Sequence, residues 1–301
     1  MHILLTGGTG LIGRALCRHW LPQGHRLTVW SRTPEKVAER CGAGVRGIGR
    51  LEDYGDGPLD AVINLAGAPI ADRPWTHKRK ALLWASRITL TEQLLAWLES
   101  RDARPQVLIS GSAVGWYGDG GERELQEDSP PVVEDFAAQL CGAWEETAQR
   151  AETLGLRVVL LRTGLVLARD GGFLKRLLPP FRLGLGGPIG NGRQWMPWIH
   201  LQDQIGLIDF LLQREDASGP YNACAPQPVR NRAFGQALGR ALHRPALLPL
   251  PGPLLKLGLG ELSGLLLGGQ KAIPQRALAA GYVFRFTDID SALADLFKDT
   301  A

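Results

Sequence analysis

The chain has 301 residues, of which 45% are hydrophobic and 21% are charged. This composition excludes a disordered chain, and the length allows one large domain or two coupled ones. With 34 basic and 30 acidic residues the net charge is only +4, and the densest basic cluster, at residues 77–80, opens a predicted helix. We therefore expect a solvated helix face there and no nucleic-acid partner.

Four cysteines lie far apart in the chain, at positions 17, 41, 141 and 224. None forms a pair at the spacing of metal ligands, which predicts free thiols, no metal site and a reducing, cytoplasmic location. The first strand begins at once, so no signal peptide is expected. The apolar stretch 249–269 contains Lys256, Glu261 and several glycines, and we expect short helices and loops there in place of a membrane span.

Short apolar runs alternate with helical periodicity through the first half of the chain. The runs predict strands at residues 2–6, 26–31, 60–66, 106–111 and 157–162. Between them, apolar residues three or four apart predict helices at residues 11–21, 76–99 and 134–154. Continuous apolar strands separated by helices are typical of a parallel sheet covered on both faces, so we predict a doubly wound α/β domain.

The pattern loosens after residue 165. Glycine is frequent at residues 182–193 and proline at residues 241–253, which predicts loops. We expect the doubly wound domain to cover residues 1–165 and a smaller, loop-rich C-terminal substrate lobe with short helices to cover residues 166–301. One further strand of the sheet is expected from residues 166–225.

The strongest motif, LLTGGTGLIGR, follows the first strand and opens the first helix. Gly7 allows the tight turn, Gly10 lets the backbone approach a pyrophosphate, and Gly13 lets helix and strand pack closely. The helix N-terminus offers unpaired N–H groups to the anion. The predicted cofactor contacts of this turn are Gly7, Thr9, Gly10, Leu11, Ile12 and Gly13. Glycine spacing alone is weak evidence, but in this context it predicts dinucleotide binding.

The second strand ends in Ser31 and Arg32, where an NAD-specific site usually places an acidic residue. A guanidinium and a hydroxyl suit the 2′-phosphate of NADP(H), and the pair lacks the carboxylate that accepts from a ribose diol. The alternative is a surface arginine without a ligand. We predict NADP(H) as the cofactor.

The next two buried strands end in small and polar residues, INLAG and GSAVGWYG. In open α/β sheets ligands bind at this carboxyl edge. Asn64, Leu65 and Ala66 are predicted to lie against the ribose and nicotinamide. Ser112 and Tyr117 are catalytic candidates because they would place hydroxyls near a substrate carbonyl. The alternatives are a turn-forming serine and a half-buried tyrosine.

The combination of GGTGLIGR, INLAG and GSAVGWYG resembles the extended short-chain dehydrogenase/reductase superfamily. Four further stretches are similar to its atypical, YfcH-like branch of epimerase-family proteins: PIADRPWTHKRK, LLRTGLVLARDGG, LPPFRLGLGGPIGNGRQWMPWIH and GGQKAIPQRALAAGYVF. The resemblance covers essentially the whole chain. It implies an NADP-binding Rossmann fold with a C-terminal lobe over the nicotinamide, whose family-specific segment is residues 248–296.

The catalytic pair of that superfamily, Tyr-x-x-x-Lys, is missing. Aligned on the helix glutamate Glu145, the tyrosine and lysine positions hold Ala137 and Cys141. A lysine there would supply roughly 4 kcal/mol to bring a tyrosine pKa from about 10 toward 7, and a thiol cannot replace it. Cys141 is interpreted as a buried packing residue, a cofactor contact, or a nucleophile or redox sensor, the last disfavoured by the lack of a cation on its helix face.

Further candidate contacts lie outside these motifs. Arg87 belongs to a segment that in this superfamily passes close to the cofactor, with a surface helix arginine as the alternative. The candidate substrate contacts are Arg182, Arg193, Trp195 and His200. The two arginines would hold an anionic substrate, and the tryptophan, with Phe181 and Trp198, would stack on a ring. His200 is either an acid/base group or, with Asp203, part of a structural pair.

Together these features predict an NADP(H)-binding oxidoreductase or epimerase-like enzyme that transfers hydride at a carbonyl or alcohol carbon. Its expected partner is a small molecule, including a sugar nucleotide. The alternative is a non-catalytic NADPH-binding sensor or regulatory module, which the loss of the tyrosine and lysine favours.

Overall fold

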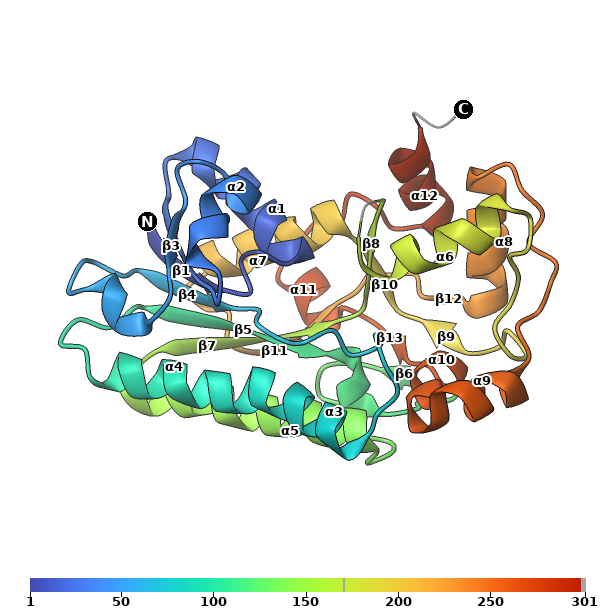
Figure 1. The fold of residues 1–301 in the computed structure, drawn as a ribbon, viewed down its shortest axis with the longest axis horizontal. Helices are drawn as coiled ribbons and strands as arrows, with labels where there is room; N and C mark the ends of the chain where they lie inside the picture. The colour runs from blue at the N-terminus through green and yellow to red at the C-terminus, as the bar shows by residue number, and fades with distance from the viewer. Residues whose placement is uncertain (170, 299–301) are drawn as a thin grey trace.

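A computed structural model describes residues 1–169 and 171–298 (Figure 1). Its centre is a seven-stranded, wholly parallel sheet in the order β11-β7-β5-β4-β1-β2-β3. The strands are β1 (His2–Thr6), β2 (Arg26–Trp30), β3 (Arg46–Ile48), β4 (Ala61–Asn64), β5 (Val107–Ala113), β7 (Arg157–Thr163) and β11 (Gly219–Ala223). The predicted doubly wound fold is confirmed. The strand order reverses between β1 and β4, which is where such sheets bind ligands.

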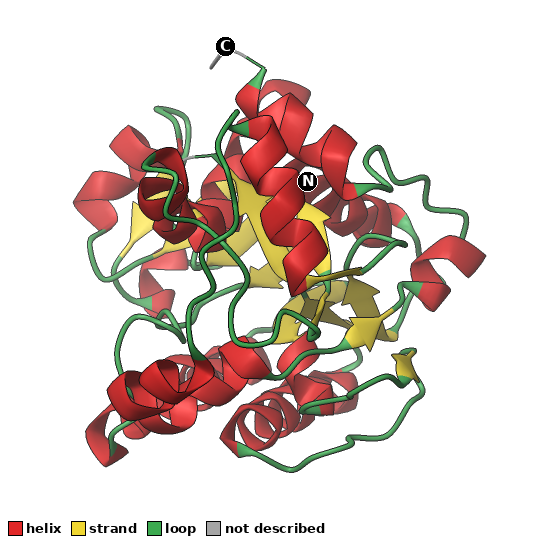
Figure 2. Cartoon of the chain, turned by 90° about the vertical axis from the view of Figure 1, so that its right-hand side faces the viewer, coloured by secondary structure: helices red, strands yellow, loops and turns green. Residues whose placement is uncertain are grey.

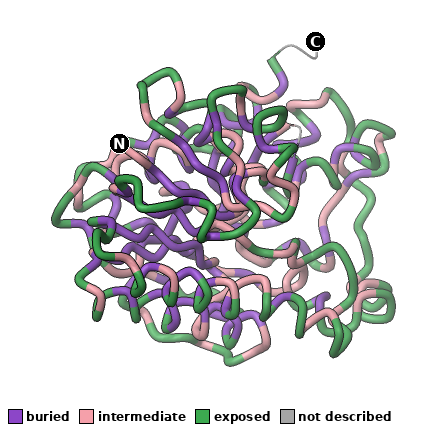
Figure 3. Tube along the Cα trace, turned by 60° about the vertical axis from the view of Figure 1, so that its left-hand side comes forward, coloured by how far each residue is buried: buried purple, intermediate pink, exposed green. Residues whose placement is uncertain are grey.

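Helices cover both faces of this sheet (Figure 1). One layer contains α1 (Leu11–Trp20), α2 (Val37–Cys41) and α7 (Leu201–Gln213), and the other contains α4 (Leu90–Glu99) and α5 (Phe136–Gln149). Consecutive strand residues point to opposite faces. Leu5 and Ile63 therefore join the core under α1 and α7, whereas Leu4 and Val62 join the core under α4 and α5. Burial on both faces explains why these strands have continuous apolar sequences, and Figure 3 shows the buried residues gathered along them.

The helix predicted at residues 76–99 is interrupted by one π turn. It consists of α3 (His77–Trp84), the π turn η4 (Ala85–Thr89) and α4. The helix predicted at residues 134–154 consists of α5 followed by a 3-10 turn, η6 (Arg150–Leu154). The side chains of Thr76 and Asp135 cap the two helices by accepting backbone N–H groups.

The second half of the chain contributes to both parts of the molecule. α7 and β11 return to the sheet, and the remainder forms a C-terminal lobe, which faces the viewer in Figure 2. The lobe contains β8 (Leu165–Ala168), α6 (Gly172–Arg182), β9 (Trp195–Met196), β10 (Trp198–His200), β12 (Val229–Arg230), α8 (Asn231–Ala241), α9 (Gly252–Leu259), α10 (Gly264–Leu267) and α12 (Ile289–Phe297). Since α6 and α8 each have 11 residues, the lobe is more helical than the expected loop-rich region.

The C-terminal segment is tied to the first half of the chain. β13 (Lys271–Ala272) pairs in parallel with β6 (Glu124–Leu125), and α11 (Gln275–Ala279) contacts β11. The stretch 249–269 forms short helices and turns, as predicted. Among the described residues, no helix combines the length and the apolar character needed to cross a membrane.

Candidate functional site

The turn between β1 and α1 has the geometry that its glycines predict. Gly7 has φ +65°, in the left-handed region that favours glycine, and an added Cβ there would lie 2.5 Å from the Leu65 carbonyl oxygen. A Cβ at Gly13 would lie 2.5 Å from the Gly7 carbonyl oxygen, so glycine is needed for α1 to approach the turn. Within the described part of the chain, no side chain caps the start of α1 at Gly10. The backbone N–H groups of its first turn therefore fit an anion such as a pyrophosphate.

The end of β2 lies beside this turn. A Cβ added at Gly8 would lie 2.5 Å from Cγ2 of Val29, which places the two segments in direct contact. Ser31 and Arg32 follow β2; Ser31 Oγ accepts the Thr33 N–H at 3.2 Å, and Arg32 is exposed. The position of both residues suits a phosphate on the adenosine ribose, and their contact with a cofactor stays a prediction.

Asn64, at the end of β4, has a side chain that is committed to the protein. Its Oδ1 accepts from Thr6 Oγ1 at 2.7 Å, and its Nδ2 donates to Thr91 Oγ1 at 2.9 Å and to Ser110 Oγ at 3.1 Å. The fully buried amide thus ties together β1, β4, β5 and α4. The amide thus has no hydrogen left for a ligand, and the predicted position of Asn64 against the cofactor stays a prediction. Leu65 and Ala66 lie against the glycine turn.

Ser112 points into a buried network beneath the strand ends. Its Oγ donates to Glu145 Oε1 at 2.6 Å. Both carboxylate oxygens of Glu145 are held by Arg162, at 2.8 Å and 2.9 Å. Because an ion-paired carboxylate only accepts hydrogen bonds, the single hydroxyl hydrogen of Ser112 is used here. The serine oxygen has only acceptor lone pairs left for a ligand.

Tyr117 belongs to the same network and is fully buried. Its hydroxyl lies 2.8 Å from Asn222 Oδ1 and 2.9 Å from the Gln126 carbonyl oxygen, and it accepts from Arg162 Nη1 at 3.2 Å. Burial raises the pKa of Tyr117 to about 12. A catalytic tyrosine needs a lowered pKa and access to substrate. The structure therefore contradicts the predicted acid/base role of Tyr117 and assigns it a structural one.

His200 is also a structural residue. It is 2% exposed, its Nδ1 accepts the Gln202 N–H at 3.1 Å to cap α7, and its ring lies 4.1 Å from that of Phe286. Burial lowers the pKa of His200 to about 4, so the ring is neutral. These contacts favour a structural role. Because His200 also lines a cavity with Leu11 and Gln202, its predicted substrate contact or acid/base role stays a prediction. Trp198 and Phe181, predicted to stack on a substrate, are buried in the core of the C-terminal lobe.

The remaining predicted substrate contacts lie on the surface of the C-terminal lobe. Arg182 ends α6, Arg193 precedes β9, and both are exposed. Trp195 is half-buried, with its ring centroid 4.5 Å from the Arg230 guanidinium and its Nε1 3.3 Å from a carboxylate oxygen of Glu122. None of these contacts identifies a substrate, and the three residues stay predictions.

Ala137 and Cys141 face the loop that follows β5. A Cβ added at Gly115 would lie 3.5 Å from Ala137 Cβ and 3.8 Å from Cys141 Sγ. Cys141 is 6% exposed, and burial raises the pKa of its thiol to about 12. The thiol is therefore neutral, which contradicts the nucleophile and redox-sensor interpretations and agrees with packing. Its predicted cofactor contact stays a prediction.

A cavity of about 230 Å³ opens beside Ala137, where the superfamily's tyrosine would stand. Small residues of α5 and the β5 loop line one side, and the C-terminal segment lines the other. Its lining includes Gly115, Gly118, Asp119, Asp135, Ala137, Lys256, Gly264 and Gln270. Lys256 was not among the predicted site residues, although a single lysine in the apolar sequence of α9 was a visible signal.

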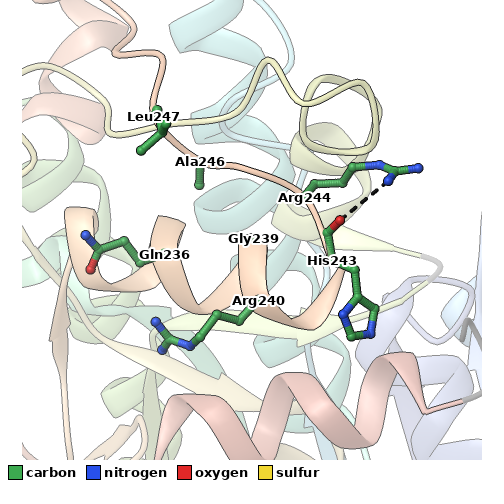
Figure 4. Close-up of a pocket in the computed structure, with 7 residues that line it drawn as sticks. All are labelled: Gln236, Gly239, Arg240, His243, Arg244, Ala246 and Leu247. Atoms are coloured by element: carbon green, nitrogen blue, oxygen red, sulfur yellow. Dashed lines mark hydrogen bonds between the residues drawn. The ribbon is translucent and has the colours of Figure 1, made fainter.

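Another hollow lies on the C-terminal lobe, at the end of α8 (Figure 4). Its cations are committed to the protein, because Arg240 pairs with Asp290 at 2.6 Å and Arg244 donates to the Arg182 carbonyl at 3.0 Å. Figure 4 shows the Arg244 side chain turned toward the His243 carbonyl. This hollow contains none of the predicted site residues.

A glycine turn for phosphate at the carboxyl edge of a doubly wound parallel sheet defines a Rossmann-type dinucleotide-binding protein. The sequence matches two family models. Residues 3–224 match the NAD dependent epimerase/dehydratase family, and residues 250–296 match a domain of unknown function, DUF1731. The chain therefore belongs to the NAD dependent epimerase/dehydratase family, and the resemblance inferred from its motifs is confirmed.

Relatives align along the whole chain. It is 36% identical to the epimerase family protein YfhF of Bacillus subtilis over 301 residues, 99% of each chain. It is 38% identical to the mouse epimerase family protein SDR39U1 over 299 residues, 98% of this chain and 99% of the relative. Human SDR39U1 (isoform 2), crystallised with NADPH, superposes with a TM-score of 0.90 at 36% identity, covering 99% of this chain and 100% of that chain. A nucleoside-diphosphate sugar epimerase of Corynebacterium glutamicum superposes with a TM-score of 0.78 at 30% identity, covering 99% of this chain and 58% of that chain.

Proposed function

We propose that this protein binds NADP(H) and acts as an oxidoreductase, with epimerase-like hydride transfer on a small alcohol, carbonyl or sugar-nucleotide substrate. The observation that carries the proposal is the glycine turn, in which Gly7 and Gly13 leave room for a pyrophosphate beside the uncapped start of α1. Arg32 at the end of β2 favours the phosphorylated cofactor. The NADPH in the human SDR39U1 crystal, 36% identical to this chain, supports the same choice.

The bound cofactor would supply or accept the hydride, and the chain would bind and orient both partners. Ser112 would accept a hydrogen bond from a substrate hydroxyl, because its own hydrogen is donated to Glu145 at 2.6 Å. It is therefore better suited to an alcohol than to the oxygen of a carbonyl group. The cavity beside Ala137 would hold the substrate, with Lys256 as a cationic donor at its edge.

A second candidate is a non-catalytic NADPH sensor. The observation that favours it is that the two candidate catalytic hydroxyls are hydrogen-bonded inside the protein: Ser112 donates to Glu145, and the hydroxyl of Tyr117 lies between Arg162 and Asn222. Turnover separates the two candidates. Oxidation of NADPH with carbonyl compounds, or reduction of NADP⁺ with alcohols, both followed at 340 nm, would support the oxidoreductase, and tight binding without turnover in either direction would support the sensor.

Fluorescence titration with NADPH and NADH tests the cofactor assignment. Arg32→Glu should weaken NADPH binding by about tenfold or more, since it replaces a charge-assisted contact to phosphate with repulsion. Arg26→Glu is the matched control, because Arg26 is an exposed arginine at the opposite end of the same strand. Equal NADPH affinity of Arg32→Glu and the unmodified protein would contradict the NADP(H) assignment.

The proposal extends to the surroundings of the protein. A reducing cytoplasm suits its four cysteines, which are all buried free thiols. Its proposed partner is a small molecule. No nucleic-acid partner is proposed, in keeping with a net charge of only +4.

A further inference from the structure

We infer that one side of the C-terminal lobe is a docking surface for an anionic lipid membrane, which the protein touches without crossing it. The inference goes beyond the proposed function and does not depend on cofactor binding. The surface consists of exposed leucines with arginine side chains among them. We call it the leucine surface, and its members are Leu183, Leu185, Leu247, Leu248, Leu254 and Leu257.

Two loops that lie side by side form the first part of this surface. The loop after α6 is hydrogen-bonded to the loop after α8: the Leu248 N–H donates to the Gly186 carbonyl at 3.1 Å, and the Leu250 N–H donates to the Pro188 carbonyl at 2.8 Å. Both loops run along the right-hand edge of the molecule in Figure 1, the side that faces the viewer in Figure 2. Their exposed leucines therefore belong to one side of the lobe.

The helix α9 continues the leucine surface. It starts at Gly252, directly after the second loop, and its residues Leu254 and Leu257 are three apart, so they lie on the same face of the helix. Leu257 is 86% exposed and Leu247 is 78% exposed, so both side chains stand out from the protein. Single exposed leucines are ordinary, whereas a group of adjoining ones marks a contact with a protein or a membrane.

The sequence around the leucine surface is positively charged. The chain has 30 acidic residues, yet residues 171–202 and 217–260 contain no aspartate and no glutamate, while they contain four and five arginines or lysines. Arg182 and Arg244 belong to the two loops and are exposed. Among the described residues, no carboxylate oxygen lies within 4.0 Å of either guanidinium. Arg244 donates only to backbone carbonyls, those of Arg182 and His243.

Acidic side chains next to this region are paired with other cations. Glu261, which follows α9, pairs with Lys80 of α3 at 2.6 Å, and Asp290 of α12 pairs with Arg240 at 2.6 Å. The two loop arginines therefore keep their charge for a negative ligand. An anionic membrane offers that charge in its lipid phosphates, directly beside an apolar interior that accepts leucine side chains.

The composition of the leucine surface argues against two other occupants. In a two-fold dimer the same patch of each copy forms the interface, so a second copy of this chain would bring two positively charged surfaces face to face. The residues that contribute most to binding at protein interfaces are enriched in tryptophan, tyrosine and arginine, and leucine is under-represented among them. Leucine beside lysine or arginine is instead typical of segments that lie in the surface of a membrane.

Co-sedimentation of the full chain with lipid vesicles tests the inference. We expect binding to vesicles of phosphatidylcholine and phosphatidylglycerol in equal amounts. Binding to phosphatidylcholine alone should be weaker by about tenfold or more, and binding to the mixed vesicles should weaken as the salt concentration rises. Arg182→Gln should weaken binding to the mixed vesicles by about fivefold, the effect of one cation near an anionic surface.

A pair of leucine substitutions tests the apolar part of the contact. Leu247→Gln with Leu257→Gln removes two apolar side chains without changing the charge, and it should weaken binding to the mixed vesicles by about tenfold or more. Val283→Gln is the matched control. Val283 is 85% exposed, as Leu257 is, but its neighbour Tyr282 packs on Phe210 of α7, away from the leucine surface. This variant should bind like the unmodified protein.

Four results would overturn the inference. The first is failure of the unmodified protein to bind the mixed vesicles, and the second is equal binding to vesicles with and without phosphatidylglycerol. The third is an equal loss for Val283→Gln and the leucine variant. The fourth is a dimer in sedimentation velocity runs that the leucine variant dissociates, which would make the leucine surface an interface between two copies of the chain.

Discussion

The substitution Tyr117→Phe separates a structural role of this residue from a catalytic one. The hydroxyl lies 2.8 Å from Asn222 Oδ1 and accepts from Arg162 Nη1 at 3.2 Å. Phenylalanine would remove that partner from Asn222, whereas Arg162 would keep its bond of 3.0 Å to the Glu127 carbonyl. A buried polar group without a partner costs about 1–3 kcal/mol. We expect Tm to fall by about 2–4 °C for each kcal/mol lost, the scale of a large domain.

Scanning calorimetry of the full chain measures this loss, and an NADPH titration of the same samples should show unchanged affinity. Tyr54→Phe is the matched control: Tyr54 is also buried, but its hydroxyl donates to the Pro58 carbonyl at 2.7 Å in a part-buried bond within one loop, so a smaller loss is expected. A Tyr117→Phe variant with unchanged Tm and lost turnover would refute the structural role and restore the catalytic one.

Three further predictions follow from burial and close packing. Burial lowers the pKa of His200 from 6.5 to about 4, so the free energy of unfolding should fall by about 3 kcal/mol as the pH falls through this range. Denaturant titrations at pH 7 and pH 4 should show a smaller fall for His200→Asn than for the unmodified protein. An equal fall would contradict the burial of a neutral His200. Gly13→Ala should weaken NADPH binding by about tenfold or more, because its Cβ would lie 2.5 Å from the Gly7 carbonyl oxygen. The control is Gly142→Ala in α5, where an added Cβ meets nothing within 4 Å, and its NADPH affinity, measured by titration calorimetry, should be unchanged. Burial raises the pKa of Cys141 to about 12, so a disulfide reagent at pH 8 should label it only after denaturation, and rapid labelling of the native protein would argue against a buried thiol.

The strands were predictable where both faces of the sheet are covered. β5 and β7 are buried along almost their whole length, so their sequences contain continuous apolar runs. β3 was missed because it is a three-residue edge strand, in which Arg46 is exposed and Gly47 has no side chain. The periodicity of apolar residues in a sequence reflects which side chains are buried, and a short edge strand buries few side chains.

The glycine turn was predictable because the residues that form it are adjacent in the sequence. The surroundings of Tyr117 were not predictable, because they come from distant parts of the chain. Its partner Asn222 is 105 residues away in the chain, and nothing near Tyr117 indicates that its hydroxyl turns to β11. The environment of His200 likewise depends on Phe286 and on Asp295, whose carboxylate lies 3.5 Å from its ring. The position of Lys256 at the cavity requires the C-terminal segment to fold back over α5. Such long-range packing leaves no periodic pattern in a single sequence.

The position of β11 late in the sequence has a consequence for the chain as it is synthesised. β7 pairs with β5 on one side and obtains its second neighbour only from residues 219–223. Until those residues leave the ribosome, β7 is an apolar strand with an open edge of the kind that recruits strands from other molecules. Translation that stalls while β8 and α6 are being made would leave this edge open for longer. The strand that closes this edge therefore lies more than 200 residues after the cofactor turn in the sequence.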